Sequence, residues 1–478
     1  MKSAKIFGLI TILLLLFVPV FVFSQSFGFG DEETESASGK TPAVNITGEI
    51  SASFQVFTED CASYEKIKET NLGNIFSGKI NFSASGKAAD GLISLKIDPE
   101  FSGAFPGASV SIDEAYLRLY FGPVDVEGGI RKLSWGRADS FGPLDVVNPY
   151  DYSDLSAISS PKSIKIARPM LHVNWNINTF SRLEGVFVPW FAGNEYALKG
   201  RWAPPQITEI GSSLVEGLVS EYGLPSLLFT AWLSNFDITK FYKNSNDTLE
   251  YAQGGLRFTT TIGETDLGMQ YYFGRLPRPS YSVDLSDFIA SLFLSPPPNP
   301  DKIHIFVNNN YYHHIGVDYA QVIAGFNIRA EAGANITGDL AGDDGTVYNR
   351  HLVWSLGFDR NVIWGININL QGNGLVRLKY DKIGSDPLVI DTEDGKKISS
   401  TRITAVLSRK FFQDTLEFKT TALWGIEDRD FFIVPAVIWS KNDITAELSV
   451  GIFGGDKTGE LGQYRDNCYV KTVLGWSF

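Results

Sequence analysis

From Val44 onward the chain repeatedly alternates apolar and polar residues, and each run stops at glycine, asparagine, aspartate or proline. Runs of period two indicate β-strands with two different faces. In the first run Val44, Ile46, Ile50, Phe54 and Val56 share one face, and polar residues occupy the other. Many runs reach about ten residues, which is the length that a tilted strand needs to cross hydrocarbon, whereas strands of globular proteins usually have about five or six. The pattern predicts an all-β fold with membrane-spanning strands.

The spacing between runs alternates between short turns and long loops in the second half of the chain. Bacterial outer-membrane barrels place short turns in the periplasm and long loops outside. We therefore predict a single closed antiparallel transmembrane β-barrel over residues 43–478, whose long extracellular loops carry short helices. Short turns are expected near Gly263–Thr265, Asp359–Asn361, Gln413–Asp414 and Lys441–Asp443, and long loops at Leu276–Asn310, Gly338–Asn349, Gln371–Ser399 and Gly454–Asn467.

The number of strands depends on how one segment is interpreted. Nineteen segments alternate, but closed single-chain barrels normally have an even number of strands. If Ser226–Phe236 belongs to an external loop spanning Phe191–Glu250, the barrel has about 18 strands; if Ala197–Ala203 is a strand as well, it has about 20. We favour 18 within a range of about 16 to 20. Helix-like spacing in Ile207–Tyr222 and Val283–Leu294 predicts helices packed in loops.

The N-terminus has the order of a secretory signal. Lys2 and Lys5 precede the uncharged run Ile6–Phe23, and small residues follow at Ser24 and Ser26. This order predicts a signal peptide over residues 1–24, removed near Ser24, although an uncleaved anchor helix is the alternative. Residues 25–42 are acidic and rich in Gly and Ser, and are expected to form a disordered periplasmic tail.

The final run, Tyr469–Phe478, ends the chain on an aromatic residue, with Val470, Leu474 and Trp476 on one face. A terminal Phe after alternating apolar residues resembles the signal that the barrel-assembly machinery reads in outer-membrane barrels. The resemblance implies that Val470, Leu474, Trp476 and Phe478 form such a signal. An ordinary edge strand that happens to close the chain is the alternative reading.

One long connection carries a conspicuous motif. G-x-x-x-L-S-W-G-x-x-D begins at Gly129 and is followed by L-D-V-V-N-P-x-D from Leu144 to Asp151. These residues resemble the corresponding loop of a broad group of large bacterial outer-membrane β-barrels, porin-like and alginate-export-like. Similar stretches follow at Arg168–Ile177, Leu183–Phe191 and Gly254–Arg275. In that group some members are associated with passage of hydrophobic substrates and others with exopolysaccharide export, so the resemblance implies the fold and a transport class.

The loop from Trp135 to Leu155 is the candidate constriction. Pro143 and Pro149 stiffen it, Asp145 and Asn148 can bond to their own backbone, and Trp135 can wedge against the wall. A stiff loop that folds inward would place charges at the narrow point. The alternative is that these residues only fold the loop and that an aspartate neutralises Arg137. The pore-loop candidates are Trp135, Arg137, Asp139, Asp145, Asn148 and Asp151.

Polar strand faces should line the lumen, and their charges nearly balance. The basic positions are Lys79, Lys96, Arg118, Arg131, Arg257, Arg329, Arg402, Lys419 and Lys471. The acidic positions are Glu49, Asp98, Glu114, Asp125, Glu127, Asp266, Glu331, Glu417 and Glu447. Without Lys2 and Lys5 the mature chain has 39 basic and 54 acidic residues, so most of the charge near -15 falls in loops and tail. This distribution would enrich cations at the mouth, and lumen charges that pair across strands would stiffen the wall.

The two cysteines, Cys61 and Cys468, flank the outer ends of the first and last strands, which closure makes neighbours. We hypothesise a disulfide across this seam in an oxidising compartment; two free thiols are the alternative. Two cysteines are too few for a disulfide scaffold.

Composition and motifs argue against several other functions. A hydrophobic content of 44% argues against a disordered chain, and a formal charge of -13 argues against nucleic-acid binding. The five histidines show no serine-spaced pair, and no G-x-S-x-G elbow, zinc spacing, Walker loop or dinucleotide fingerprint occurs. A calcium site from Asp139, Asp145, Asp151 and Asp154 has the wrong spacing. We predict no enzyme, no cofactor and no metal.

A barrel this wide leaves a water-filled lumen unless something plugs it. The leading prediction is therefore a porin-like outer-membrane channel for passive or weakly selective passage of small solutes, constricted by the loop around 135–155. A dedicated transporter for a hydrophobic or polysaccharide substrate is the first alternative, and an adhesin or structural barrel with a closed lumen is the second. The expected partners are outer-membrane lipids, the barrel-assembly machinery and small solutes, and both monomer and trimer stay open.

Overall fold

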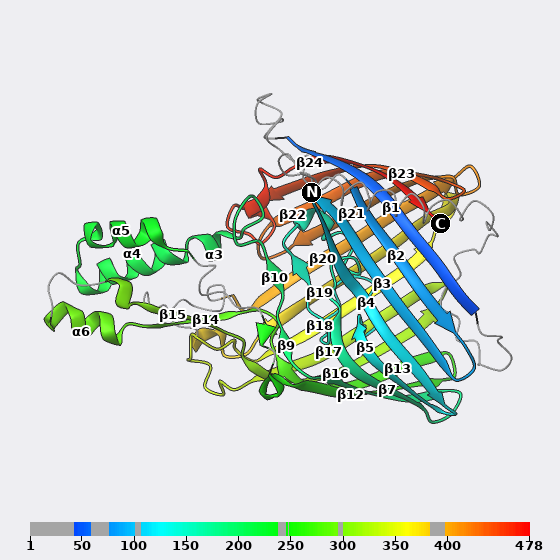
Figure 1. The fold of residues 1–478 in the computed structure, drawn as a ribbon, viewed down its shortest axis with the longest axis horizontal. Helices are drawn as coiled ribbons and strands as arrows, with labels where there is room; N and C mark the ends of the chain where they lie inside the picture. The colour runs from blue at the N-terminus through cyan, green and yellow to red at the C-terminus, as the bar shows by residue number, and fades with distance from the viewer. Residues whose placement is uncertain are drawn as a thin grey trace, which may run out of the picture.

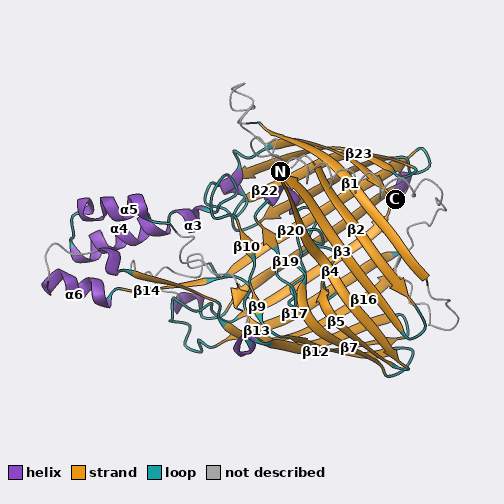
Figure 2. Ribbon diagram, in the orientation of Figure 1, coloured by secondary structure: helices purple, strands orange, loops and turns teal. Residues whose placement is uncertain are grey.

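The computed structural model describes residues 43–58, 76–100, 107–237, 245–246, 248–294, 300–382 and 397–478. In these residues an 18-stranded antiparallel sheet closes into a barrel (Figures 1 and 2). The fold class and the favoured strand number are thus confirmed. The barrel strands are β1 (Ala43–Phe57), β2 (Phe76–Ser85), β3 (Ala89–Glu100), β4 (Gly107–Phe121), β5 (Val124–Arg131), β7 (Arg168–Asn176), β8 (Ser181–Val188), β12 (Gln253–Ile262), β13 (Thr265–Arg275), β16 (Tyr311–Ile323), β17 (Phe326–Thr337), β18 (His351–Asn361), β19 (Ile366–Arg377), β20 (Ser399–Phe411), β21 (Leu416–Gly425), β22 (Asp430–Lys441), β23 (Ile444–Gly455) and β24 (Tyr469–Ser477).

The segment that left the strand number open is helical. Ser226–Phe229 forms the 3-10 helix η4 and Thr230–Asn235 forms α5, within the long connection from β8 to β12. Its alternation of large apolar residues fits a strand, but Pro225 directly precedes it and a polar run follows from Asp237, so the segment is too short for a membrane span. Among its described residues, the connection from β8 to β12 therefore contains no barrel strand, and this includes Ala197–Ala203.

Turns and loops segregate to opposite ends of the barrel. Short turns join β4 to β5, β12 to β13 and β22 to β23, while the connections after β5, β8 and β13 are long. Two predicted boundaries are wrong. Asp359–Asn361 ends β18 rather than forming a turn, and β19 continues past Gln371 to Arg377, because polar lumen-facing residues extend these strands and resemble loop sequence.

The two faces of the wall differ as the alternation predicted. In β13, Leu267, Met269, Tyr271 and Phe273 are exposed, whereas the residues between them are mostly buried. The same division recurs around the barrel, where exposed residues such as Ile46, Leu171, Leu256, Ile315, Leu356, Trp424 and Leu448 all lie on outward positions. A continuous apolar outer face on a closed barrel is the arrangement that hydrocarbon requires.

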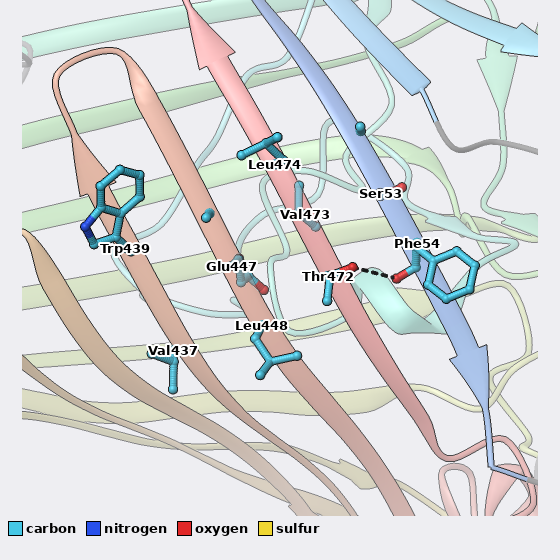
Figure 3. A pocket seen from close by; sticks show the side chains of 11 residues that line it. Ser53, Phe54, Val437, Trp439, Glu447, Leu448, Thr472, Val473 and Leu474 are labelled. Carbon is cyan, nitrogen blue, oxygen red and sulfur yellow. Dashed lines mark hydrogen bonds between the residues drawn. The ribbon is translucent and has the colours of Figure 1, made fainter.

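The seam between the first and last strands closes the barrel. β1 pairs with β24 from Glu49↔Ser477 to Phe57↔Tyr469. The amide and carbonyl of Gly48 exchange hydrogen bonds of 2.8 and 2.9 Å with those of Phe478. On the outer face a shallow apolar groove crosses the seam, bordered by Phe54, Leu448 and Leu474 (Figure 3). This groove belongs to the lipid-facing surface.

A helical arm projects beyond the loop end of the barrel (Figure 1). It contains α3 (Pro205–Thr208), α4 (Ile210–Tyr222), α5, α6 (Ser286–Leu294) and the hairpin of β14 (Ser280–Asp284) with β15 (His304–Asn308). Leu214, Leu218, Phe229 and Phe288 form its own buried core. Both predicted loop helices are therefore present, although Val283 belongs to β14. Among the described residues, no helix has both the length and the apolar character needed to cross a membrane.

Several N-terminal predictions lie outside the described residues. They are the signal peptide over 1–24, the tail over 25–42 and the disulfide partner Cys61. The thiol of Cys468 contacts the carbonyls of Arg465 at 3.3 Å and Phe453 at 3.5 Å.

The lipid-facing assignment predicts a depth-dependent cost for charge. Leu474→Arg, near the middle of β24, should destabilise the folded barrel by about 2–4 kcal/mol, because it places a guanidinium in hydrocarbon. Val473→Arg, on the lumen face beside Glu447, is the matched control and should cost less than about 1 kcal/mol. Denaturant unfolding in lipid vesicles, followed by tryptophan fluorescence, measures both, and equal losses would contradict the assignment of faces.

Candidate functional site in the barrel lumen

The connection from β5 to β7, residues 132–167, folds into the barrel, and we call it the lumen loop. Its two ends are tied by Asn148, which is 3% exposed. The Asn148 side chain accepts a hydrogen bond from the amide of Leu133 at 2.8 Å and donates to the carbonyls of Arg131 and Ile166 at 3.0 and 2.8 Å. The predicted loop residue Asn148 thus fixes the neck of the loop rather than facing open space.

The tip of the loop reaches the opposite wall. The Glu331 carboxylate on β17 accepts hydrogen bonds from the amides of Arg137 and Ala138, the latter at 2.8 Å. Gln371 on β19 accepts from the amides of Asp139 and Ser140 at 3.0 and 3.1 Å. Wall side chains therefore satisfy backbone donors that the loop would otherwise bury unpaired.

Gly136 makes this approach possible. Its φ is +90°, in the region that favours glycine. A Cβ at Gly136 would also collide with the Glu331 carboxylate. The glycine in the W-G pair of the motif is thus required by the close contact between loop and wall.

Ion pairs fix the tip in position. The Arg137 guanidinium contacts Asp318 on β16 at 2.7 Å and Asp266 on β13 at 3.2 Å. Asp139 pairs with Arg329 on β17 and accepts a hydrogen bond from Asn369 at 2.8 Å. Asp318 lies past the midpoint of β16 toward its turn end, so the tip reaches deep into the barrel.

An apolar cluster fills the space between the loop and the near wall. Trp135 and Val147 of the loop pack with Met170 on β7, Val188 on β8 and Tyr272 on β13. The rings of Trp135 and Tyr272 meet edge to face, with centroids 6.2 Å apart. The wedge predicted for Trp135 is present in this geometry, and it covers one sector of the lumen.

A buried polar cluster supports the same half of the loop. The Lys165 ammonium contacts the Asp145 carboxylate and, at 2.6 Å, the hydroxyl of Ser134. The Tyr150 hydroxyl donates to the same carboxylate at 2.8 Å. Burial and the Asp145 charge raise the pKa of the Tyr150 phenol far above its usual range. Asp145 is therefore a structural anion that binds Tyr150 and Lys165 through one carboxylate oxygen.

The second half of the loop packs on the closing seam. Leu155 and Ile158 join Trp202, Phe453 and Tyr469 in a second apolar cluster. The Tyr469 hydroxyl donates to the carbonyl of Ser156 at 3.1 Å. Asp151 lies away from the tip in the two-residue strand β6 (Asp151–Tyr152), where its carboxylate accepts from the amide of Ser153 at 2.8 Å.

The predicted lumen charges form a paired network near β4, β5 and β7. Glu127 contacts Arg118 at 2.5 Å, Arg131, and His172 at 3.2 Å. The other ring nitrogen of His172 lies 3.3 Å from Glu184. These groups brace the wall, as the cross-strand alternative expected.

A β-bulge adds one residue that the sequence pattern missed. The register of β3 and β4 passes from Ser94↔Glu114 to Leu95↔Ile112, so Asp113 is the extra residue. Asp113 pairs with Lys79 at 2.7 Å and Lys132 at 2.5 Å. Glu114 accepts from the amide of Lys132 at 2.9 Å.

Other predicted charges stand apart from these clusters. Glu417 and Lys419 share the lumen face of β21, opposite the exposed Phe418. Asp125 lies on the same face of β5 as Glu127 and Arg131. The four aspartates weighed for calcium do not converge, and the described residues hold no group of three or more potential metal ligands.

Three residues of the site were not predicted from the sequence: Asp318, Gln371 and Lys165. Asp318 and Gln371 occupy lumen-facing positions in alternating strands, so the period-two pattern places them on the correct face. Nothing in the sequence indicates that the loop tip lands on them, because the contacts join residues far apart in the chain.

Tyr196 lies in β10 (Glu195–Tyr196), outside the barrel strands. Titration of its phenol tests whether the loops at the mouth bury this side chain. Burial raises the pKa of this phenol from 10.0 to about 12. The difference in tyrosinate absorbance between the protein and its Tyr196→Phe variant should therefore titrate near 12. Because the unfolded phenol ionises first, the fold around Tyr196 should lose stability as pH rises from 10.0 to about 12. A difference curve centred near 10.0 would contradict the burial.

No protein-family model matches the sequence, and no curated protein matches it. Solved structures share its overall form at low identity. OccK5 (OpdH) of Pseudomonas aeruginosa has 7% identity and a TM-score of 0.46 over 91% of this chain and 98% of its own. OccAB4 of Acinetobacter baumannii has 9% identity and a TM-score of 0.46 over 93% of this chain and 100% of its own. Wzi of Escherichia coli, an outer-membrane carbohydrate-binding β-barrel involved in capsule assembly, has 9% identity and a TM-score of 0.44 over 91% and 84%. The fold assignment rests on the strand pairing of the chain itself.

Proposed function

We propose that the protein is a weakly selective channel of the bacterial outer membrane for small solutes, constricted by the tip of the lumen loop. The main support for a constriction is that Arg137 and Asp139 reach across the lumen to β13, β16 and β17. An 18-stranded barrel is too wide for side chains alone to fill. A loop that crosses such a lumen sets its narrowest section.

The wall sector at β2 and β3 supports an aqueous path. Lys79 and Lys96 are register partners on β2 and β3 and lie on the lumen face. Their side chains are 43% and 56% exposed. Long charged side chains in the middle of an inward face keep this exposure only where water reaches them. The lumen beside β2 and β3 is therefore the solute path in this proposal.

Charges around the tip favour weak cation preference. Three arginines meet five carboxylates there, so the cluster carries an excess of negative charge. The groups are Arg137, Arg257 and Arg329 with Asp139, Asp266, Asp318, Glu331 and Asp359. Because most of these charges are paired, their net electric field is too weak for strong ion selectivity.

A surface-binding role is the second candidate. The helical arm has its own apolar core and projects past the barrel end, where a partner outside the cell would meet it first (Figure 1). Such a role does not need an open lumen. Conductance therefore separates the two candidates.

The first test is single-channel conductance of the refolded protein in planar bilayers. Combining Arg137→Ala with Glu331→Ala removes the ion pairs of Arg137 and the acceptor of two tip amides, while Asp139 keeps its contacts with Arg329 and Asn369, so the tip should loosen and conductance should rise about twofold. Asp287→Ala, an exposed carboxylate on α6, is the matched control and should leave conductance unchanged. Absence of conductance in every form would sink the channel proposal, and unchanged conductance in the double variant would remove the tip as the constriction.

Ion selectivity gives a second measurement. In a salt gradient at low ionic strength the reversal potential should show a modest cation preference, which shrinks toward zero as added salt screens the carboxylates. Asp266→Asn combined with Asp359→Asn should reduce the preference, because it removes the charge excess at the tip. An anion preference in the unmodified protein would contradict the charge assignment.

A further inference from the structure

Four side chains gather on the outer face of the barrel where β13 and β16 reach its loop end, at the base of the helical arm (Figure 1). They are Tyr271, Phe273, Tyr311 and His313, and we call them the rim cluster. All four are exposed and occupy outward positions of the two strands. The rings of Phe273 and Tyr311 stack with centroids 5.7 Å apart, and those of Phe273 and His313 have centroids 4.9 Å apart. The rim cluster is thus one contiguous patch.

His313 gives this patch a hydrogen-bond donor. The Tyr271 hydroxyl and the His313 Nδ1 share a hydrogen bond of 2.8 Å. When the phenol donates, the proton of the neutral imidazole is on Nε2. Within the described part of the chain, His313 Nε2 has no hydrogen-bond partner. The exposed imidazole can therefore donate to a ligand.

Arg275 adds a permanent positive charge beside the rim cluster. Its guanidinium carbon lies 3.6 Å from the centroid of the Tyr311 ring and 4.1 Å from that of Tyr251, so two rings restrict its position. Its Nη1 donates to the carbonyl of Asn309 at 2.8 Å. None of the described carboxylates forms an ion pair with this half-buried side chain. The arginine charge is therefore left without a counter-charge from the protein.

The nearby Glu250 does not supply that counter-charge. It contacts the rim cluster through its backbone carbonyl, which accepts a hydrogen bond from the Tyr311 hydroxyl at 3.3 Å. The patch at the loop end of β13 and β16 is consequently cationic as well as aromatic.

An apolar groove crosses the same outer face over β12, β13, β16 and β17, and we call it the outer groove. Its lining includes the outward residues Phe258, Met269, Val317, Tyr319 and Ala332. Ala332 is the register partner of Val317, and the neighbouring outward residue on β17, Ala330, is that of Tyr319. Small side chains beside large ones leave a hollow in the wall.

The rim cluster and the outer groove follow one another along the same strands. Met269 pairs with Val317 in the groove, and Phe273 pairs with His313 in the cluster. The two pairs are separated by four residues, or about 13 Å at roughly 3.3 Å per residue. Long loops of bacterial barrels lie outside the cell. The cluster then lies at the level of outer-leaflet headgroups, and the groove lies deeper, at the level of acyl chains.

A general aromatic girdle accounts for part of this surface. Such girdles flank the apolar band of outer-membrane barrels, and they explain Tyr271, Phe273 and Tyr311. They do not explain a histidine on the lipid-facing side, nor an arginine held between two rings without a carboxylate. Both cationic features are suited to an anionic headgroup.

We propose that the rim cluster and Arg275 bind the phosphate headgroup of one outer-leaflet lipid, with an acyl chain of the same lipid in the outer groove. Arginine donates two parallel hydrogen bonds to a phosphate, and the His313 Nε2 adds a third donor. The aromatic rings contact the apolar region just below the headgroup. This site goes beyond the proposed channel function, because it lies on the outside of the wall and does not depend on an open lumen.

The test is native mass spectrometry of the full chain, released from detergent micelles after titration with diphosphoryl lipid A. The unmodified protein should retain one lipid, and its apparent affinity should fall about tenfold in Arg275→Gln combined with His313→Gln. Ala332→Phe fills the outer groove without touching the charges, and it should weaken binding to a similar degree. Heat-modified gel mobility confirms that each variant is a folded barrel.

Two controls separate a specific site from general charge attraction. Arg465→Gln removes the charge of an exposed arginine between β23 and β24, away from β13 and β16, and should bind as the unmodified protein does. A synthetic lipid A that lacks both phosphates should bind at least tenfold more weakly than the diphosphoryl form. Equal binding of the two lipids, or equal losses in Arg465→Gln and in the double variant, would overturn the proposal.

Other occupants of the surface would give different results. Competition by inorganic phosphate at the same concentration as the lipid, together with unchanged binding in Ala332→Phe, would indicate a free-anion site and overturn the lipid assignment. An oligomer of the unmodified protein that Ala332→Phe dissociates, without retained lipid, would indicate that a second copy covers the outer groove, and would overturn it as well.

Discussion

Hydrocarbon leaves no partner for a backbone amide or carbonyl, and this constraint governs the whole molecule. Eighteen strands satisfy it only because β1 meets β24 and the terminal residue bonds to Gly48. Closure fixes the circumference, and the circumference in turn leaves a lumen that wall side chains cannot fill. The long connection after β5 is therefore free to fold inward, and its position inside the barrel follows from the geometry of the wall.

Inside the barrel the lumen loop faces polar wall residues instead of hydrocarbon. Its buried polar groups are therefore satisfied by individual side chains and not by a regular strand ladder. Asn148 joins the neck of the lumen loop, Glu331 and Gln371 receive amides of its tip, and Lys165 holds Asp145. Each contact satisfies a group that would otherwise be buried unpaired. The loop is thus held on the wall mainly by polar contacts, and Trp135 adds an apolar contact with wall residues.

Much of the wall is predictable from sequence and much of the lumen is not. Alternation gives strand faces because side chains switch sides at every residue, so the lumen positions of Glu127, Arg131 and Glu331 are predictable. Other features are harder to predict, because short apolar or polar runs fit more than one structure. They include the helix at Thr230–Asn235 and the ends of β18 and β19. The landing of Arg137 on Asp318 depends on closure of the whole barrel, and no local pattern encodes it.

The contacts of the lumen loop also order events during assembly. The loop lies early in the chain, yet it docks on strands β13 to β19, and Ser156 bonds to Tyr469 across a sequence separation of 313 residues. These contacts cannot form before the later strands are in place, and such non-local contacts are reached late. The lumen loop therefore takes its final place in the lumen only after the strands on which it docks are present.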